Sequence, residues 1–248
     1  MLGRKKKPRS IPLPRSVESS LDSALDRALS VQRPVILNYI DRARSKGAMT
    51  PAQLITRMEH RYLAAVASIG AASGGVAAVP GVGTATSIAS AAVEITAFVE
   101  ATAVYALAVA EVHGVPTHDP VLRRALVLGV LLGDASAEVV GQGGVIMGWG
   151  QVLAQRTPEK MNLINKTMLK KVATHFGTRQ GALVLGRAMP LGIGAGIGAA
   201  GNAALGRAAI AAVRKAFGPP PKLFPPRVVE PGPPPPAPAL GWSAPYRR

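Results

Sequence analysis

The sequence predicts an all-α fold, an Ala/Gly-rich bundle of about seven or eight helices. Three observations lead to this prediction. Apolar residues recur at helical spacing, as Val17, Leu21, Leu25 and Leu29 do. No segment combines strict apolar–polar alternation with β-branched residues, as a strand would. Apolar residues make up 48% of the chain but aromatic residues only 4%, so small side chains would let the helices approach closely.

We expect three parts along the chain. Residues 1–15 carry six basic groups and three prolines, a composition typical of a disordered basic arm. Residues 16–217 carry the helical periodicity and form the folded domain. Residues 218–248 are rich in proline, which predicts a disordered tail with polyproline II character.

Several helix boundaries can be predicted from capping residues. One helix is predicted to start at Thr50-Pro51-Ala52-Gln53, where Thr50 is the N-cap, Pro51 stands at N1, and the Gln53 side chain can accept a hydrogen bond from the N-cap residue. A later helix is predicted to start at Asp119-Pro120, with an N-cap and a proline at N1. The uncharged stretch 62–93 is divided by Pro80 and Gly81, which predicts a helical hairpin.

The second arm of this hairpin is expected to end at His113-Gly114. Thr157-Pro158 begins a helix that we expect to end at Gly177, and a separate helix is expected from Thr178 to Met189. A final helix is predicted from about residue 193 to Phe217, where glycine and three prolines stop it.

The net charge of +16 is unevenly distributed. Residues 1–61 hold 13 basic and 5 acidic side chains, so their net charge is +8. Residues 62–155 hold 2 basic and 6 acidic side chains, so their net charge is −4. Residues 156–222 hold 11 basic side chains and 1 acidic side chain, so their net charge is +10. Two basic regions around an apolar middle indicate a polyanionic partner, either anionic lipid or nucleic acid.

The apolar segments are poor candidates for autonomous membrane spans. Residues 84–110 contain Glu94 and Glu100, and residues 182–206 contain Arg187, Pro190 and Asn202. One charge at the centre of a span costs about 2.5 to 3.5 kcal/mol, which offsets what the apolar residues contribute. Peripheral or shallow association with a membrane is therefore favoured over spanning helices, and a soluble bundle is the other alternative.

The segment 158–173 is the most specific candidate for a membrane contact. Its apolar residues Met161, Ile164, Met168, Leu169 and Val172 fall on one arc, and its lysines lie opposite or beside that arc. The alternative is a packed helix with a solvated outer face. Together with the basic arm, this segment gives the candidate residues for binding anionic lipid: Arg4, Lys5, Lys6, Lys7, Arg9, Lys160, Lys166, Lys170 and Lys171.

Small residues spaced by four predict close helix packing, within the chain or in a glycine-zipper interface. The pairs include Gly70 with Gly74 and Gly194 with Gly198. Arg187 is the only charged residue between Arg179 and Arg207, so we also consider a buried ion pair between Glu94 and Arg187.

Catalytic and metal-binding patterns are weak. The chain has no cysteine, and Glu111, His113, His118 and Asp119 match no helical ligand spacing, so we expect no metal and no cofactor. We expect the protein not to be an enzyme. A hydrolase that uses Glu111, His113 or His118 remains the alternative.

The order of these features resembles the EcsC family over roughly residues 50–217. The resemblance lies in the Gly-rich segment 70–81, the helix from Glu94 to Val112, the Asp119-Pro120 start, and the run 187–202 with its proline, glycines and asparagine. By this resemblance, the architectural positions are Gly70, Gly74, Pro80, Gly81, Pro190, Gly194, Gly198 and Asn202. The resemblance implies a helical, membrane-associated bacterial protein and supplies no catalytic residue.

Sequence and resemblance together predict an interaction or accessory protein at the cytoplasmic face of the cell membrane, peripheral or partly embedded. Its expected partners are anionic lipids, with a membrane protein complex or a homo-oligomer as further possibilities. A soluble nucleic-acid-binding helical protein is the alternative, which the scarcity of aromatic residues disfavours.

Overall fold

The structure, a computed structural model, describes residues 15–30, 33–45, 49–77, 84–136, 139, 149–187 and 193–226. Within these ranges the chain forms eight α-helices, one 3₁₀ turn and no strand, which confirms the predicted all-α class. The elements are α1 (Arg15–Leu29), α2 (Arg33–Ser45), α3 (Pro51–Ala77), α4 (Thr84–Val112), α5 (Pro120–Leu132), η1 (Gly133–Ala135), α7 (Trp149–Ala154), α8 (Pro158–Arg187) and α9 (Ile193–Phe217).

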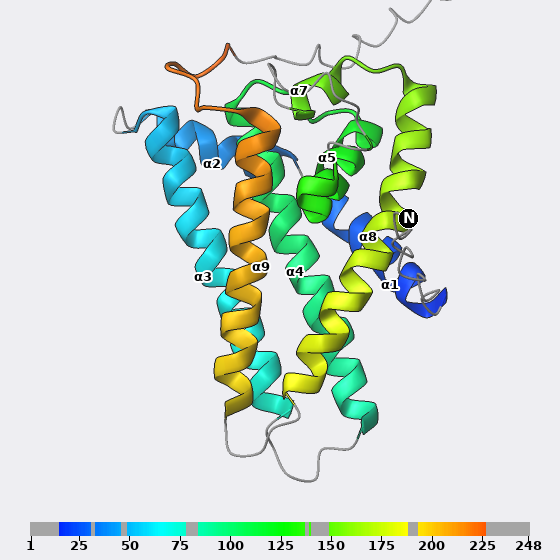
Figure 1. The fold of residues 1–248 in the computed structure, drawn as a ribbon. Helices are drawn as coiled ribbons and strands as arrows, with labels where there is room; N and C mark the ends of the chain where they lie inside the picture. Colours follow the sequence, from blue (N-terminus) through cyan, green and yellow to red (C-terminus); the bar gives the residue numbers. More distant parts are fainter. Residues whose placement is uncertain are drawn as a thin grey trace, which may run out of the picture.

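Four long helices, α3, α4, α8 and α9, run lengthwise through the molecule (Figure 1). We call the end at which α3 and α8 finish and α4 and α9 begin the hairpin end. The shorter helices α2, α5 and α7 lie toward the opposite end, which we call the capped end, and α1 lies beside α4 (Figure 1).

The core lies along the long helices and beneath α1 and α5. Its largest fully buried side chains come from six of the eight described helices, so burial of apolar area joins these elements into one body. These side chains are Phe98, Leu25, Leu54, Leu107, Leu126, Leu128, Leu153, Met168, Val66, Val99, Val109 and Val112.

The predicted helix starts at residues 50 and 119 are confirmed. The Thr50 amide donates to Gln53 Oε1 at 2.9 Å, and the Gln53 amide donates to Thr50 Oγ1 at 3.3 Å, which is the reciprocal pair of a capping box. Asp119 Oδ1 accepts from the Val121 amide at 2.8 Å, with Pro120 at the start of α5. The end of α4 is confirmed too, since Gly114 has a φ of 74° after Val112 closes the helix.

Two expectations need correction. The segment 158–187 forms the single helix α8, although two helices meeting at residues 177–178 were predicted. One glycine inside a helix costs about 1 kcal/mol relative to alanine, too little to end a long packed helix. Residues 218–226, which were assigned to the disordered tail, instead extend the folded part beyond Phe217. Residues 1–14 and 227–248, the rest of the expected arm and tail, lie outside the described residues.

Candidate functional site

The apolar arc of α8 faces the interior of the bundle. Met161, Met168 and Val172 are buried, and Ile164 and Leu169 pack partly buried against the same core. This side of α8 lies against α5 and α1. Because the apolar arc is used for folding, it is not free to lie in a headgroup layer, and the helix instead presents its polar face outward.

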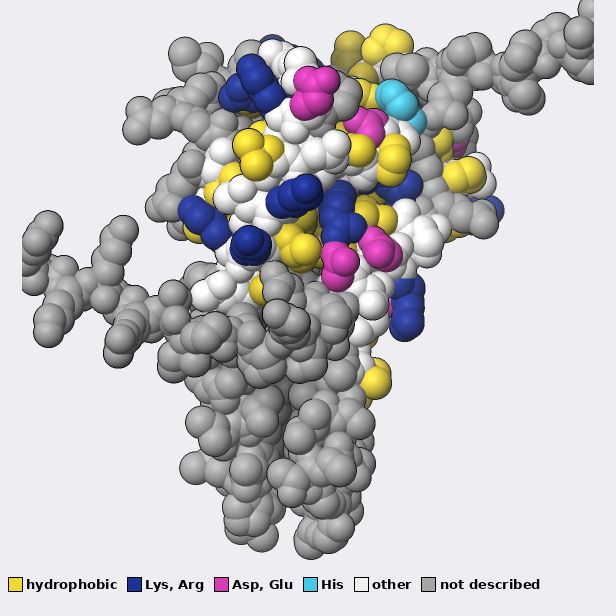
Figure 2. All heavy atoms as spheres, turned by 90° about the vertical axis from the view of Figure 1, so that its right-hand side faces the viewer, with side chains coloured by type: hydrophobic (Ala, Val, Ile, Leu, Met, Phe, Trp, Pro, Cys, Tyr) yellow, Lys and Arg dark blue, Asp and Glu magenta, His cyan; other side chains and the backbone are white. Residues whose placement is uncertain are grey.

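The outward face of α8 is basic. Lys160, Lys166 and Lys170 are exposed, while Lys171 is half-buried and has a polar partner within the protein. Leu163 lies among them with 68% of its surface exposed. Viewed from the side that α8 occupies in Figure 1, Lys and Arg side chains gather over the half nearer the capped end (Figure 2). An exposed aliphatic side chain among lysines matches the composition of a surface that meets anionic headgroups.

A hollow of about 570 Å³ lies between α1, α5 and α8 beside these lysines. Lys166 and Asn165 line it from α8, and Arg124 lines it from α5. The Arg124 guanidinium is engaged by Asp22 and by Asp26, the latter at 2.7 Å. Asn165 Nδ2 donates to the Val121 carbonyl at 3.0 Å, whereas its Oδ1 is buried without a hydrogen bond. Lys166 is therefore the exposed cation of this hollow.

A second hollow, of about 500 Å³, is lined by an ion pair between the buried Glu59 and the exposed Arg214 near the capped end. Arg214 Nε and Nη2 donate to the two carboxylate oxygens of Glu59 at 2.8 and 2.7 Å. Tyr105 stacks on Tyr62 with ring centroids 4.6 Å apart, and burial raises the pKa of both phenols well above their usual value of 10.0. These tyrosines stay neutral at physiological pH, so neither supplies a phenolate base.

His113 also lines this hollow but is held in a structural position. Its Nδ1 lies 2.9 Å from the Val109 carbonyl, and its ring stacks on Phe217 at 5.4 Å. Burial lowers the pKa of His113 below its ordinary value of 6.5, and nearby backbone carbonyls oppose that shift. The Glu111 carboxylate accepts a hydrogen bond from Thr117, and His118 is exposed. His113 thus contacts a backbone carbonyl and an aromatic ring, and the hydrolase alternative stays untested.

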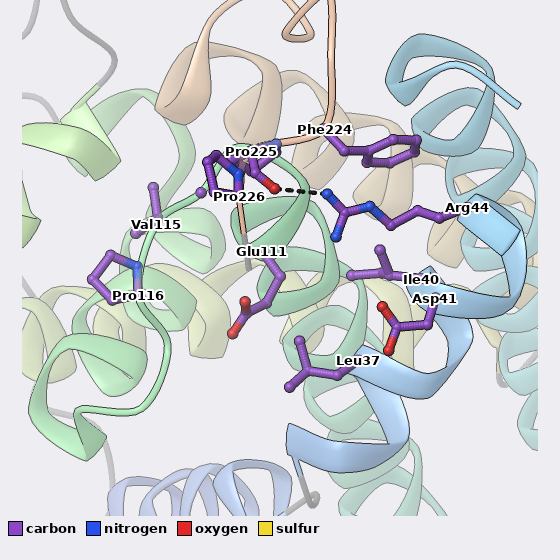
Figure 3. Close-up of a pocket in the computed structure, with 11 residues that line it drawn as sticks. Leu37, Ile40, Asp41, Arg44, Glu111, Val115, Pro116, Phe224, Pro225 and Pro226 are labelled. Carbon is purple, nitrogen blue, oxygen red and sulfur yellow. Dashed lines mark hydrogen bonds between the residues drawn. The ribbon is translucent and has the colours of Figure 1, made fainter. Parts of the chain in front are cut away.

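A pocket at the capped end is covered by the segment after α9 (Figure 3). Arg44 of α2 donates to the Pro225 carbonyl at 2.6 Å and lies over the Phe224 ring at 4.8 Å. The remaining space is about 40 Å³, room for one or two waters and too small for a metabolite. The contacts around this pocket anchor the chain and leave no substrate site.

The predicted packing residues are brought together in part. Gly70 on α3 meets Gly198 on α9 so closely that a Cβ on either would strike the other's carbonyl oxygen. Gly74 is buried beside Gly198, and Asn202 is fully buried beside Gly70. The described residues do not include Pro80, Gly81 and Pro190, and they give no contacts for Gly194.

The remaining predicted residues can be placed only in part. Glu94 is buried, with 2% of its surface exposed, and accepts a hydrogen bond from Ser73 at 2.6 Å. The side chain of Arg187 is outside the described set, so the Glu94–Arg187 pair is untested. The same holds for Arg4, Lys5, Lys6, Lys7 and Arg9.

The sequence analysis missed three arginine contacts that the fold creates: Arg214 with Glu59, Arg124 with α1, and Arg44 with the segment 224–225. Each joins residues about a hundred or more positions apart, and a single sequence carries no signal that pairs them. Among the described residues, no group of three His, Asp or Glu side chains could hold a metal ion.

One stretch of the described helices, Val93–Val112 of α4, is long and apolar enough to cross a membrane. Since 61% of it is buried inside the bundle, the same stretch also fits the core helix of a soluble protein.

Fold and surface together define an all-helical bundle protein with a basic flank on α8 and a small pocket covered by residues 224–226 at the capped end. No family model matches the chain, and no match is found among the curated proteins or the solved structures. The resemblance to the EcsC family therefore remains a prediction from the residues quoted for it.

Proposed function

We propose that this protein is a non-enzymatic accessory protein of the EcsC type that binds the anionic cytoplasmic surface of a cell membrane. One observation carries the proposal: Lys160, Lys166 and Lys170 project from one exposed face of α8 with the exposed Leu163 among them. Each lysine near an anionic membrane surface contributes about 1 kcal/mol, and an aliphatic side chain adds to this by entering the interface.

Nucleic acid is the competing polyanion, since the same lysines could contact phosphates. Binding of single strands usually adds aromatic side chains on which bases stack. The large apolar side chains that the described surface exposes are all aliphatic, namely Val35, Val93, Val104, Leu163 and Leu223. This composition favours lipid over nucleic acid.

The test is co-sedimentation with vesicles of phosphatidylglycerol and phosphatidylcholine, compared with vesicles of phosphatidylcholine alone. The triple variant Lys160→Gln, Lys166→Gln and Lys170→Gln should lower the partition coefficient on anionic vesicles on the order of a hundredfold, because three contributions are removed. A higher salt concentration should also lower the partition coefficient of the wild-type protein on anionic vesicles, because salt screens the lysine charges.

The matched control removes three exposed charges at the capped end, with Arg42→Gln, Lys215→Gln and Lys222→Gln. It changes the net charge equally and should lower binding far less. Equal losses in the two variants would mean that overall charge, and not the α8 face, determines binding. Tight binding of duplex or single-stranded DNA with no binding to anionic vesicles would overturn the proposal in favour of nucleic acid.

A further inference from the structure

The second hollow, which Glu59 and Arg214 line, lies where α3 begins and where α4 and α9 end. Its walls are otherwise largely aliphatic and come from these three helices: Ala52, Ile55, Val109 and Val213. Its volume of about 500 Å³ falls within the usual range for a site that holds a small molecule, about 300 to 1,000 Å³. Largely apolar walls with a few polar groups are also typical of such sites.

The side of this hollow that α9 leaves open is closed by the segment that follows the helix. Gly218 has a φ of 76°, and its amide donates to the Arg214 carbonyl at 2.9 Å, so the chain turns sharply after α9. The turn places residues 219–220 along the hollow. Further on, Arg44 donates to the Pro225 carbonyl (Figure 3). The segment is thus held on both sides of its contact with the hollow.

Arg214 supplies hydrogen-bond donors to this hollow. An arginine carries five N–H groups in a fixed, planar arrangement. Glu59 accepts from two of them, one on Nε and one on Nη2, which leaves three. Arg214 makes no other hydrogen bond to the described residues, and 67% of its side chain is exposed. These three N–H groups are therefore available to an acceptor that enters the hollow.

The formal charges on the residues that line the hollow cancel at neutral pH. Arg214 is paired with Glu59, and burial lowers the pKa of His113 below 6.5, so its imidazole is neutral. An anionic ligand would be attracted by the guanidinium and repelled by the adjacent carboxylate, so it would gain little. A neutral carbonyl oxygen can accept from the guanidinium without bringing a charge out of water.

We infer that this hollow binds a small neutral molecule that is apolar except for one carbonyl group, such as an alkyl ester of a short fatty acid, with its carbonyl oxygen accepting from Arg214. The aliphatic part lies against Ile55, Val109 and Val213. It displaces water that finds few polar partners between these side chains. The hollow is separate from the lysines of α8, so the inference does not depend on membrane binding.

The experiment is isothermal titration calorimetry of the full-length protein with three ligands of similar length: methyl octanoate, octanoate and octane, each below its solubility limit. Methyl octanoate should bind most tightly. Octane lacks the acceptor and octanoate brings a charge next to Glu59, so each should bind on the order of tenfold more weakly.

Two substitutions on α3 locate the site. Thr56→Trp places an indole ring at an exposed position that lines the hollow, and it should abolish binding of methyl octanoate. Ser68→Trp makes a matched change at an exposed position about 18 Å further along α3, and it should leave binding unchanged. Circular dichroism checks that both variants are helical.

A double variant tests the role of the guanidinium. Glu59→Leu with Arg214→Leu removes both members of the ion pair, an exchange that proteins often tolerate when the replacements pack well. The preference for methyl octanoate over octane should fall from about tenfold to near unity, while octane still binds. This result does not depend on how Thr56→Trp folds.

Three results would overturn the inference. The first is that none of the three ligands binds. The second is that octanoate binds more tightly than its ester, which would mean that the site selects an anion. The third is that folded Thr56→Trp binds methyl octanoate like the wild type, which would place the ligand elsewhere. Binding of Thr56→Trp to anionic vesicles should equal that of the wild type, so a failure here is distinguishable from a failure of the membrane proposal.

Discussion

At the scale of single residues, the closest approach in the bundle is the contact of Gly70 with Gly198. A side chain at either position would meet backbone atoms of the opposite helix, which cannot move aside as a flexible side chain can. These two glycines therefore determine how closely α3 and α9 approach each other. The packing of the buried side chains beside them depends on this distance.

We predict that Gly198→Ala lowers the free energy of unfolding by about 1 to 3 kcal/mol, the usual cost of overpacking. Urea denaturation measures it. Gly196→Ala is the matched control on the same helix, because a Cβ there meets no atom within 4 Å. It should leave stability unchanged or raise it by up to about 1 kcal/mol through helix propensity. Equal effects of the two substitutions would mean that the close contact does not determine stability.

The sequence pattern of single residues predicted part of the helix packing. The spacing of Gly70, Gly74 and Gly198 indicates positions for close packing, and the structure places these three together. The spacing cannot say which helix meets which, because any two small-residue faces are compatible. Glu59 and Arg214 illustrate the same limit for charges, since only the meeting of α3 with α9 brings them together.

At the scale of elements, helix ends were predictable where the signal is local. The capping box of α3 and the Asp119 cap of α5 are formed by residues within three positions, so the sequence alone defines them. The continuity of α8 could not be predicted in this way, because the packing of the whole helix outweighs the low helix propensity of the single residue Gly177. The role of its apolar arc was ambiguous for a related reason: core packing and membrane contact require the same periodicity.

The end of α4 makes folding stability depend on pH. His113 follows the helix, stacks on Phe217 at the end of α9, and has its pKa lowered chiefly by burial. The unfolded chain then binds a proton more readily than the folded chain as pH falls through 6.5, so the free energy of unfolding should decrease below that pH. One such group contributes a slope of less than about 1.4 kcal/mol per pH unit.

Urea denaturation of the wild type and of His113→Phe, at several pH values between about 7.5 and 5.5, measures this contribution. The phenyl ring keeps the stacking on Phe217 and has no proton to gain, so the variant should show a smaller slope. His60→Gln, at an exposed position of α3, is the control and should keep the wild-type slope. A slope unchanged by His113→Phe would assign the acid sensitivity to other groups.

At the scale of the whole molecule, the segment after α9 joins three parts of the capped end. Phe224 and Pro225 are held by Arg44 of α2, and Pro225 packs against Gly114, which follows α4 (Figure 3). The Pro-rich composition indicates a tail but not where it leaves the folded part, because proline leaves the backbone carbonyls free to accept hydrogen bonds.

We predict that the folded unit ends near Pro226. Removing residues 227–248 should leave the free energy of unfolding unchanged. Removing residues 219–248 should lower it by about 1 to 2 kcal/mol, because the Arg44 hydrogen bond and its contact with an aromatic ring are lost, less the entropy of ordering the segment. Arg44→Ala in the full chain should produce most of the same loss, and it should speed hydrogen exchange of the α2 amides. If both truncations behave like the wild type, the segment rests on the bundle without stabilising it. If both are destabilised, residues beyond 226 take part in the fold.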